Sequence, residues 1–223
     1  MIENCWVADR CNKRSCAEDF CMRKYKLDCL YEHTLLPESY KKEKPLYLDE
    51  TEVDKLAYIK LSNIRKDINN FVNSGNNLHI HSAVCGNGKT EWAVRLLKAY
   101  LFSIWHSADV EACRGLFIHV PKFLQALKDN ISEKSEYVKY VKENIYNADL
   151  VVFDEFATGE FTRFEGESIL SIVNDRINNK KSNIYTSNIS NKELRDLMGE
   201  RLYSRVVQDS IEVVFNESDK RGK

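Results

Sequence analysis

The stretch Leu78-His79-Ile80-His81-Ser82-Ala83-Val84-Cys85-Gly86-Asn87-Gly88-Lys89-Thr90 decides the fold of this 223-residue chain. It begins as a short predicted strand, 78–81, and leads into a helix predicted over 91–104. Glycine lets the turn between them curl tightly enough for backbone N–H groups to converge on an anion. A helix that starts there adds its positive end. Residues 83–90 therefore predict a P-loop, a phosphate-binding turn between a strand and a helix.

Each residue type in this turn has a chemical task. We expect Lys89 to reach the β- and γ-phosphates of ATP or ADP, and the Thr90 hydroxyl to ligate Mg²⁺. The first position is Ala83 where the usual pattern has glycine, which fits if that residue has ordinary strand dihedral angles. The predicted nucleotide-binding residues of the turn are Ala83, Val84, Cys85, Gly86, Asn87, Gly88, Lys89, Thr90 and Glu91.

A second motif, Leu150-Val151-Val152-Phe153-Asp154-Glu155, places two acids after an apolar run. The run is typical of a strand buried on both faces, and an acid at its end is costly unless something pairs with it. We expect Asp154 to bind the nucleotide-bound Mg²⁺, and Glu155 to orient and polarise the attacking water. The second carboxylate favours ATP hydrolysis, because transfer of phosphate to a small acceptor has less need of it.

Strands and helices alternate along the rest of the chain. Further strands are predicted over 115–120, 183–186 and 211–215, and further helices over 54–72 and 165–179. Ser190 and Glu193 form a capping box that opens another helix. The alternation predicts an α/β fold of three layers, with a central parallel sheet and helices on both faces.

The bulk composition narrows the class of protein. Hydrophobic residues make up 43% of the chain and charged residues 30%, as in an ordinary globular protein. The net charge of -1 gives no overall attraction to nucleic acid or to an anionic membrane. Apolar runs are too short to cross a bilayer, and the N-terminus lacks the pattern of a signal peptide. We therefore expect a cytoplasmic protein that makes no membrane contact.

Polar residues near the end of the chain can complete the site. Asn188 follows the strand at 183–186, where it could contact the γ-phosphate or the water, with Thr186 as the alternative. A turn-forming asparagine would look the same. Arg201 and Arg205 share a face if their segment is helical, and one of them could reach the nucleotide of a neighbouring subunit. Surface salt-bridging arginines are the alternative.

Four motifs in this order resemble the AAA+ helicase loaders of the bacterial and phage DnaC/DnaI type, to which the transposition ATPase IstB is related. They are Gly86-Asn87-Gly88-Lys89-Thr90, Val152-Phe153-Asp154-Glu155, Tyr185-Thr186-Ser187-Asn188 and Gly199-Glu200-Arg201-Leu202-Tyr203-Ser204-Arg205. The resemblance covers residues 78–215 and implies a P-loop AAA+ domain of the ASCE class without a C-terminal lid. It implies that Asn188 is sensor 1 and Arg205 the arginine finger, with Arg201 beside it. Subunits would self-associate on binding ATP or a partner.

The resemblance also implies a function. Such a protein would be an ATP-hydrolysing loader that places a replicative helicase on single-stranded DNA during phage or bacterial replication, in the host cytoplasm if it is phage-encoded. DNA binding would be weak, and a basic surface for it could include Arg163, Arg176, Lys180 and Lys181, although a solvated helix face has the same composition. The alternatives are an IstB-like partner of a transposase, a small-molecule P-loop kinase, and a nucleotide-gated adaptor without turnover.

Five of the seven cysteines lie within the first 29 residues. In a reducing compartment such a cluster favours a metal site over disulfides. Cys5, Cys11, Cys16 and Cys21 can close a tetrahedral Zn²⁺ site, with Cys29 or His33 in place of one ligand. Free buried cysteines are the alternative. Loaders of phages are similar in having a Cys-rich N-terminus.

The predicted organisation has three parts. Residues 1–45 form a Cys-rich segment that binds zinc and the helicase, residues 46–77 a linker helix, and residues 78–223 the ATPase domain.

Overall fold

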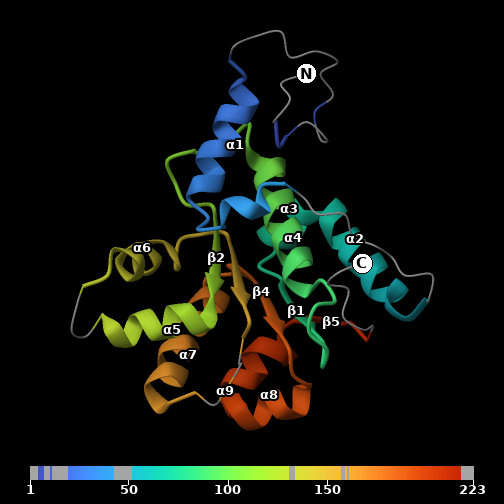
Figure 1. Ribbon diagram of the computed structural model, residues 1–223, viewed down its shortest axis with the longest axis vertical. Coiled ribbons are helices and arrows are strands. Elements are labelled where there is room, and N and C mark those ends of the chain that lie inside the picture. The colour runs from blue at the N-terminus through green and yellow to red at the C-terminus, as the bar shows by residue number, and fades with distance from the viewer. Residues whose placement is uncertain are drawn as a thin grey trace.

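A five-stranded parallel sheet forms the centre of the protein, with strand order β2-β3-β4-β1-β5 (Figure 1). The structure is a computed structural model and describes residues 5–7, 11, 20–42, 52–130, 134–156, 159 and 161–216. The strands are β1 (Asn77–His81), β2 (Gly115–His119), β3 (Leu150–Asp154), β4 (Ser182–Ser187) and β5 (Ile211–Val214). The predicted central parallel sheet is confirmed.

One face of the sheet is covered by α1 (Met22–Glu32), α2 (Lys55–Lys66), α3 (Ile68–Asn73) and α4 (Lys89–Ile104). Short 3₁₀ turns lie at Glu38–Tyr40 and Glu52–Asp54. The helices share a hydrophobic core with alternate strand residues. These strand residues are Leu78, Ile80, Phe117, Leu150, Val152, Ile184 and Val213.

The other face is covered by α5 (Val120–Asp129), α6 (Glu136–Asn144), α7 (Arg163–Asn178), α8 (Asn191–Met198) and α9 (Glu200–Tyr203), which continues into a π-helical turn, Ser204–Gln208 (Figure 1). Its core takes the intervening strand residues, among them Leu116, Ile118, Val151, Phe153 and Tyr185. The expected three-layer arrangement is therefore confirmed, because both faces of each inner strand are buried against helices.

The helix expected over 54–72 is two helices, and this prediction was wrong in detail. Asp67, with φ -115° and ψ 34°, interrupts the helix between α2 and α3. Its side chain accepts a hydrogen bond from the side-chain amide of Asn70 at 3.2 Å and does not cap the backbone of α3. Ala57 and Tyr58 of α2 are buried, whereas Leu56 is 74% exposed.

The described part of the N-terminal segment packs directly on α4. Leu27, Leu30 and Tyr31 of α1 belong to the same core as the sheet residues under α4. Lys98 of α4 is 2% exposed because its Nζ donates to the carbonyls of Tyr40 and Lys41, at 2.9 and 2.7 Å. These contacts join the region predicted as a separate segment to the sheet domain.

Candidate nucleotide-binding and hydrolysis site

The loop between β1 and α4 has the backbone of a phosphate cradle. Gly86 and Gly88 have φ values of 78° and 96°, which residues other than glycine rarely adopt. Ala83 is not among the described residues with positive φ, so alanine fits at this position as expected. Ser82 supports the turn, because its Oγ accepts hydrogen bonds from Val84 N at 3.0 Å and Asn87 Nδ2 at 2.6 Å.

Lys89 points into the cradle. Its Nζ donates to the Val84 carbonyl at 2.8 Å and to Asn87 Oδ1 at 2.9 Å, and the residue is 5% exposed. These bonds hold the ammonium within the turn, where the phosphates of a nucleotide would bind. The loop, its lysine and the first turn of α4 therefore fit the phosphates of a nucleotide.

Thr90 and Asp154 meet at the carboxyl edge of the sheet, where β3 ends. The Thr90 hydroxyl donates to Asp154 Oδ1 at 2.8 Å, and the Thr186 hydroxyl donates to the same oxygen at 2.7 Å. Burial raises the pKa of the Asp154 carboxyl above its ordinary value, although both hydroxyls lower it in part. A hydroxyl and a carboxylate side by side are hard oxygen ligands, and they fit the Mg²⁺ ion expected here.

Thr186 of β4 holds the whole Asp-Glu-Phe turn that follows β3. Besides its bond to Asp154, its Oγ accepts from Glu155 N at 3.0 Å, and its carbonyl accepts from Phe156 N at 2.7 Å. Glu155 has φ 55°, which costs a non-glycine residue about 1 kcal/mol. Thr186 thus fixes a strained residue at the position where sequence reasoning expected the base.

His119, which sequence analysis did not select, pairs with that base. The register aligns His119 of β2 with Asp154 of β3, and His119 Nε2 lies 3.1 Å from Glu155 Oε2. His119 Nδ1 accepts from Lys122 N at 3.4 Å, so that the ring proton sits on Nε2, facing the carboxylate. A polar residue at the end of a predicted strand was the signal that could have found it.

Of the remaining predicted residues, the two arginines line a separate groove, whereas Asn188 follows the strand that carries Thr186. Asn188 is half-buried directly after β4. Arg201 and Arg205 line a groove of about 570 Å³ with Leu170 and Asn174, and none of its lining residues belongs to the P-loop. Arg205 Nη1 pairs with Asp209 Oδ2 at 3.1 Å. The described chain therefore assembles Lys89, Thr90, Asp154 and Glu155 by itself, but not the arginines.

The prediction that Arg176 belongs to a basic surface for DNA is wrong, because the residue is buried. Arg176 is 0% exposed, and its guanidinium donates to Asn183 Oδ1 and to backbone carbonyls. It is a structural residue, because it satisfies carbonyls that would otherwise lack donors. Arg163 pairs with Glu167 at 2.8 Å, and Lys181 with Asp149 at 3.0 Å.

Three of the four cysteines predicted to bind zinc lie among the described residues. Cys16 lies outside the described residues, and Cys5, Cys11 and Cys21 are half-buried and free. Over the ranges that the structure describes, the group of possible metal ligands that comes together is His79, His81 and Glu212 rather than a set of cysteines. The cysteine site stays a prediction.

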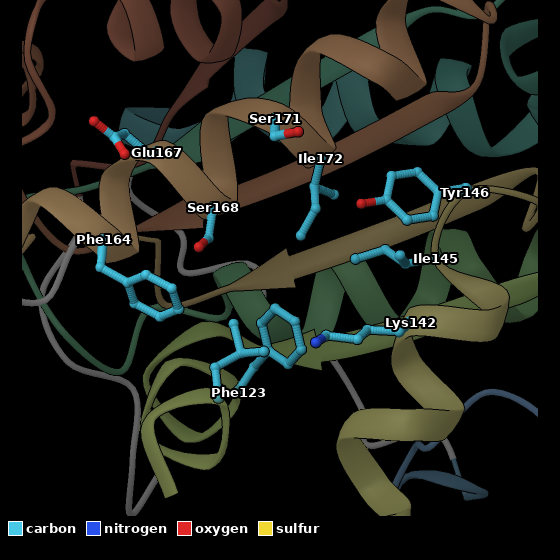
Figure 2. Close-up of a pocket in the computed structure, with 10 residues that line it drawn as sticks. Phe123, Lys142, Ile145, Tyr146, Phe164, Glu167, Ser168, Ser171 and Ile172 are labelled. Carbon is cyan, nitrogen blue, oxygen red and sulfur yellow. The ribbon is translucent and has the colours of Figure 1, made fainter. Parts of the chain in front are cut away.

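A separate apolar groove of about 420 Å³ lies between α5, α6 and α7. Figure 2 shows Phe164 and Ile172 projecting from α7 toward Phe123 and Ile145. Phe164 is 49% exposed. None of the residues that line this groove belongs to the expected nucleotide site.

Within the described residues, no helix has the length and apolar character that crossing a bilayer demands.

Comparisons with known proteins agree with this geometry. No protein-family model matches the sequence. The replicative helicase loader DnaC of Escherichia coli (strain K12) is 28% identical over 109 residues, 48% of this chain and 44% of DnaC. The match thus spans less than half the length of that curated relative.

Solved structures show the same fold. A crystal structure of the DnaC helicase loader has a TM-score of 0.64 and 23% identity, over 80% of this chain and 99% of that chain. The replication initiator DnaA, bound to AMPPCP and single-stranded DNA, has a TM-score of 0.62 and 18% identity, over 82% of this chain and 52% of that one. The predicted resemblance to AAA+ helicase loaders of the DnaC/DnaI type is therefore confirmed.

Proposed function

We propose that this protein is an ATP-hydrolysing loader of a replicative DNA helicase, acting in the replication of phage or bacterial DNA. The observation that carries the proposal is the joint placement of Lys89, Thr90, Asp154 and Glu155, held by Thr186, on a fold shared with DnaC. A kinase reading is less favoured, because Glu155 sits beside the cradle as a second carboxylate suited to activating water.

The roles of the residues follow from their positions. Lys89 and the N–H groups of the loop bind and orient the phosphates, and Asp154 and Thr90 provide oxygen ligands. Bound Mg²⁺ would neutralise charge on the β- and γ-phosphates. Glu155 would take a proton from the attacking water once its carboxylate leaves His119. Asn188, as sensor 1, would contact the γ-phosphate or that water.

The first test is steady-state ATP hydrolysis, alone and with single-stranded DNA and a replicative helicase. We expect Glu155→Gln to keep ATP binding and lose turnover, while the control Glu167→Gln, on an exposed carboxylate of α7, keeps both. Hydrolysis that persists in the Glu155→Gln variant would contradict the assignment. A rate that rises only with a small phosphate acceptor would favour a kinase, and stimulation only by a transposase an IstB-like partner.

We further propose that the active site is completed between subunits by Arg205, with Arg201 beside it. Both arginines lie in a groove away from their own P-loop. Mixing inactive Arg205→Ala with inactive Glu155→Gln should restore part of the activity, because some interfaces then combine an intact arginine with an intact base. A mixture that stays inactive would show that Arg205 does not act across subunits.

We also propose that Cys5, Cys11, Cys16 and Cys21 bind one Zn²⁺ in an N-terminal region that contacts the helicase. Cys5 and Cys21 are half-buried and free, and both lie near Lys24, whose pKa is raised first of all by its hydrogen bond to Asp28. Metal analysis should find zinc bound through thiolates, and Cys16→Ser should lose it together with helicase binding. Thiolate-bound zinc that survives Cys16→Ser would remove Cys16 from the ligand set.

A further inference from the structure

Two histidines stand where a buried strand would be expected to carry apolar residues. His79 and His81 are alternate residues of β1, so their side chains leave the same face of the sheet, opposite Leu78 and Ile80, which pack under α4. His79 is 0% exposed and His81 8% exposed. The neighbouring strand β5 places Glu212 in register with His79, on the same face.

Nitrogen and oxygen atoms of the three side chains converge. One ligand atom from each of His79, His81 and Glu212 lies within 4.8 Å of the other two. His81 Nε2 is 2.8 Å from Glu212 Oε1, and the two imidazole rings stack with centroids 4.9 Å apart and an interplanar angle of 14°. Ligand atoms of a tetrahedral site with Zn–N distances of about 2.0 Å stand about 3.3 Å apart, and the three atoms here approach that spacing.

One buried nitrogen of this group has no polar partner among the described residues. His79 Nε2 is 2.9 Å from Ser187 Oγ, but its Nδ1 is buried without a hydrogen-bond partner among the described residues. Burial and the neighbouring imidazole of His81 lower the pKa of His79 to about 3. Two imidazoles beside one carboxylate are a donor set for a divalent transition metal ion.

We propose that His79, His81 and Glu212 form a binding site for a divalent transition metal ion, with Zn²⁺ as the expected occupant. Imidazole nitrogen favours Zn²⁺ over Mg²⁺, which prefers an all-oxygen shell. Ser187 Oγ or a water takes the fourth position. Asn191 Nδ2 donates to Glu212 Oε1 and orients the carboxylate, as outer partners of metal ligands do.

A metal at this place would join strands that carry the nucleotide site. It would link β1 to the edge strand β5, and Phe215 N, directly after β5, already donates to the His81 carbonyl at 2.9 Å. The chain enters the P-loop directly after His81, through Ser82, whose N donates to the Ser187 carbonyl at 3.2 Å. The site is independent of the N-terminal cysteines and does not depend on the proposed loader function.

Co²⁺ is the probe that tests this site, since its absorption spectrum distinguishes ligand types. Full-length protein stripped with a chelator is titrated with Co²⁺ in buffer that contains Mg²⁺. We expect one equivalent of Co²⁺ to give visible d–d absorption without a thiolate charge-transfer band. Any Co²⁺ that the cysteines bind would add to this equivalent. Competition with Zn²⁺ should remove the absorption, and the metal should raise the Tm of the protein.

Two variants and one control decide the outcome. Glu212→Gln and His81→Gln should each weaken Co²⁺ binding by more than about tenfold, because even outer partners of metal ligands contribute that much. His106→Gln, on an exposed histidine, should bind as wild type does. Circular dichroism establishes that the variants fold, and Glu212, whose side chain is 41% exposed, is the gentler change. Spectra that contain only thiolate-bound cobalt, or affinities unchanged in both folded variants, would overturn the proposal.

Discussion

Replacing Thr186 by valine tests whether one hydroxyl organises the site. Valine keeps the shape of threonine and its preference for a strand. It removes the bond to Asp154 Oδ1 at 2.7 Å and leaves Glu155 N without its acceptor at 3.0 Å. The bond from the Thr186 carbonyl to Phe156 N is unaffected, because it belongs to the backbone.

The magnitude follows from these two bonds. A hydrogen bond to a charged group contributes about 1.5–3 kcal/mol, and an unsatisfied buried N–H costs about 1–3 kcal/mol. Because Glu155 is partly exposed, we take the lower half of the second range and expect a loss of about 3 kcal/mol in the free energy of unfolding. For a chain of this size that loss lowers the Tm by about 6–12 °C. A displaced Glu155 should lower kcat on the order of tenfold to a hundredfold.

Thermal unfolding and steady-state ATP hydrolysis measure the two effects separately. Thr186→Ser is the matched control, since it retains the hydroxyl and loses only a methyl group. We expect it to recover most of kcat. If Thr186→Val unfolds at the wild-type temperature and turns over at the wild-type rate, the Thr186 hydroxyl does not hold Asp154 and Glu155 in place.

Three further changes test other contacts. Arg176→Met should lower the free energy of unfolding by about 3–5 kcal/mol in urea titrations, because it leaves buried carbonyls without donors. The control Arg163→Met, at an exposed arginine, should change that free energy by less than about 0.5 kcal/mol. Burial raises the pKa of Asp154, so the folded nucleotide-free protein binds more protons than the unfolded chain between the ordinary and the raised pKa. Its stability should therefore fall as pH rises through that window, and equilibrium unfolding of Asp154→Asn should lack this dependence. His119→Ala should raise partner-independent ATP hydrolysis about twofold to fivefold at unchanged KM, because a partly exposed hydrogen bond worth about 0.5–1 kcal/mol no longer holds Glu155.

Sequence alone determined the elements whose signals are local. Short strand-like segments located the five strands of the described sheet, and the glycines, Lys89 and Thr90 located the phosphate cradle between β1 and α4. The capping box of Ser190 and Glu193 is present as predicted. Such features depend on neighbouring residues in the chain, whose dihedral preferences and side-chain spacing are readable directly. The break at Asp67 and helix α6 escaped this reasoning, because packing overrides weak local preferences.

Tertiary structure alone decided which distant side chains meet. The parallel sheet brings Thr186 beside Asp154 and His119 beside Glu155, although more than 30 residues separate the members of each pair along the chain. It also buries Arg176, which looks in sequence like any basic residue of a solvated helix, and it gathers His79, His81 and Glu212 on one face. The physical reason is that strand order and register come from non-local hydrogen bonding and burial, and these determine which side chains share an edge or a face of the sheet.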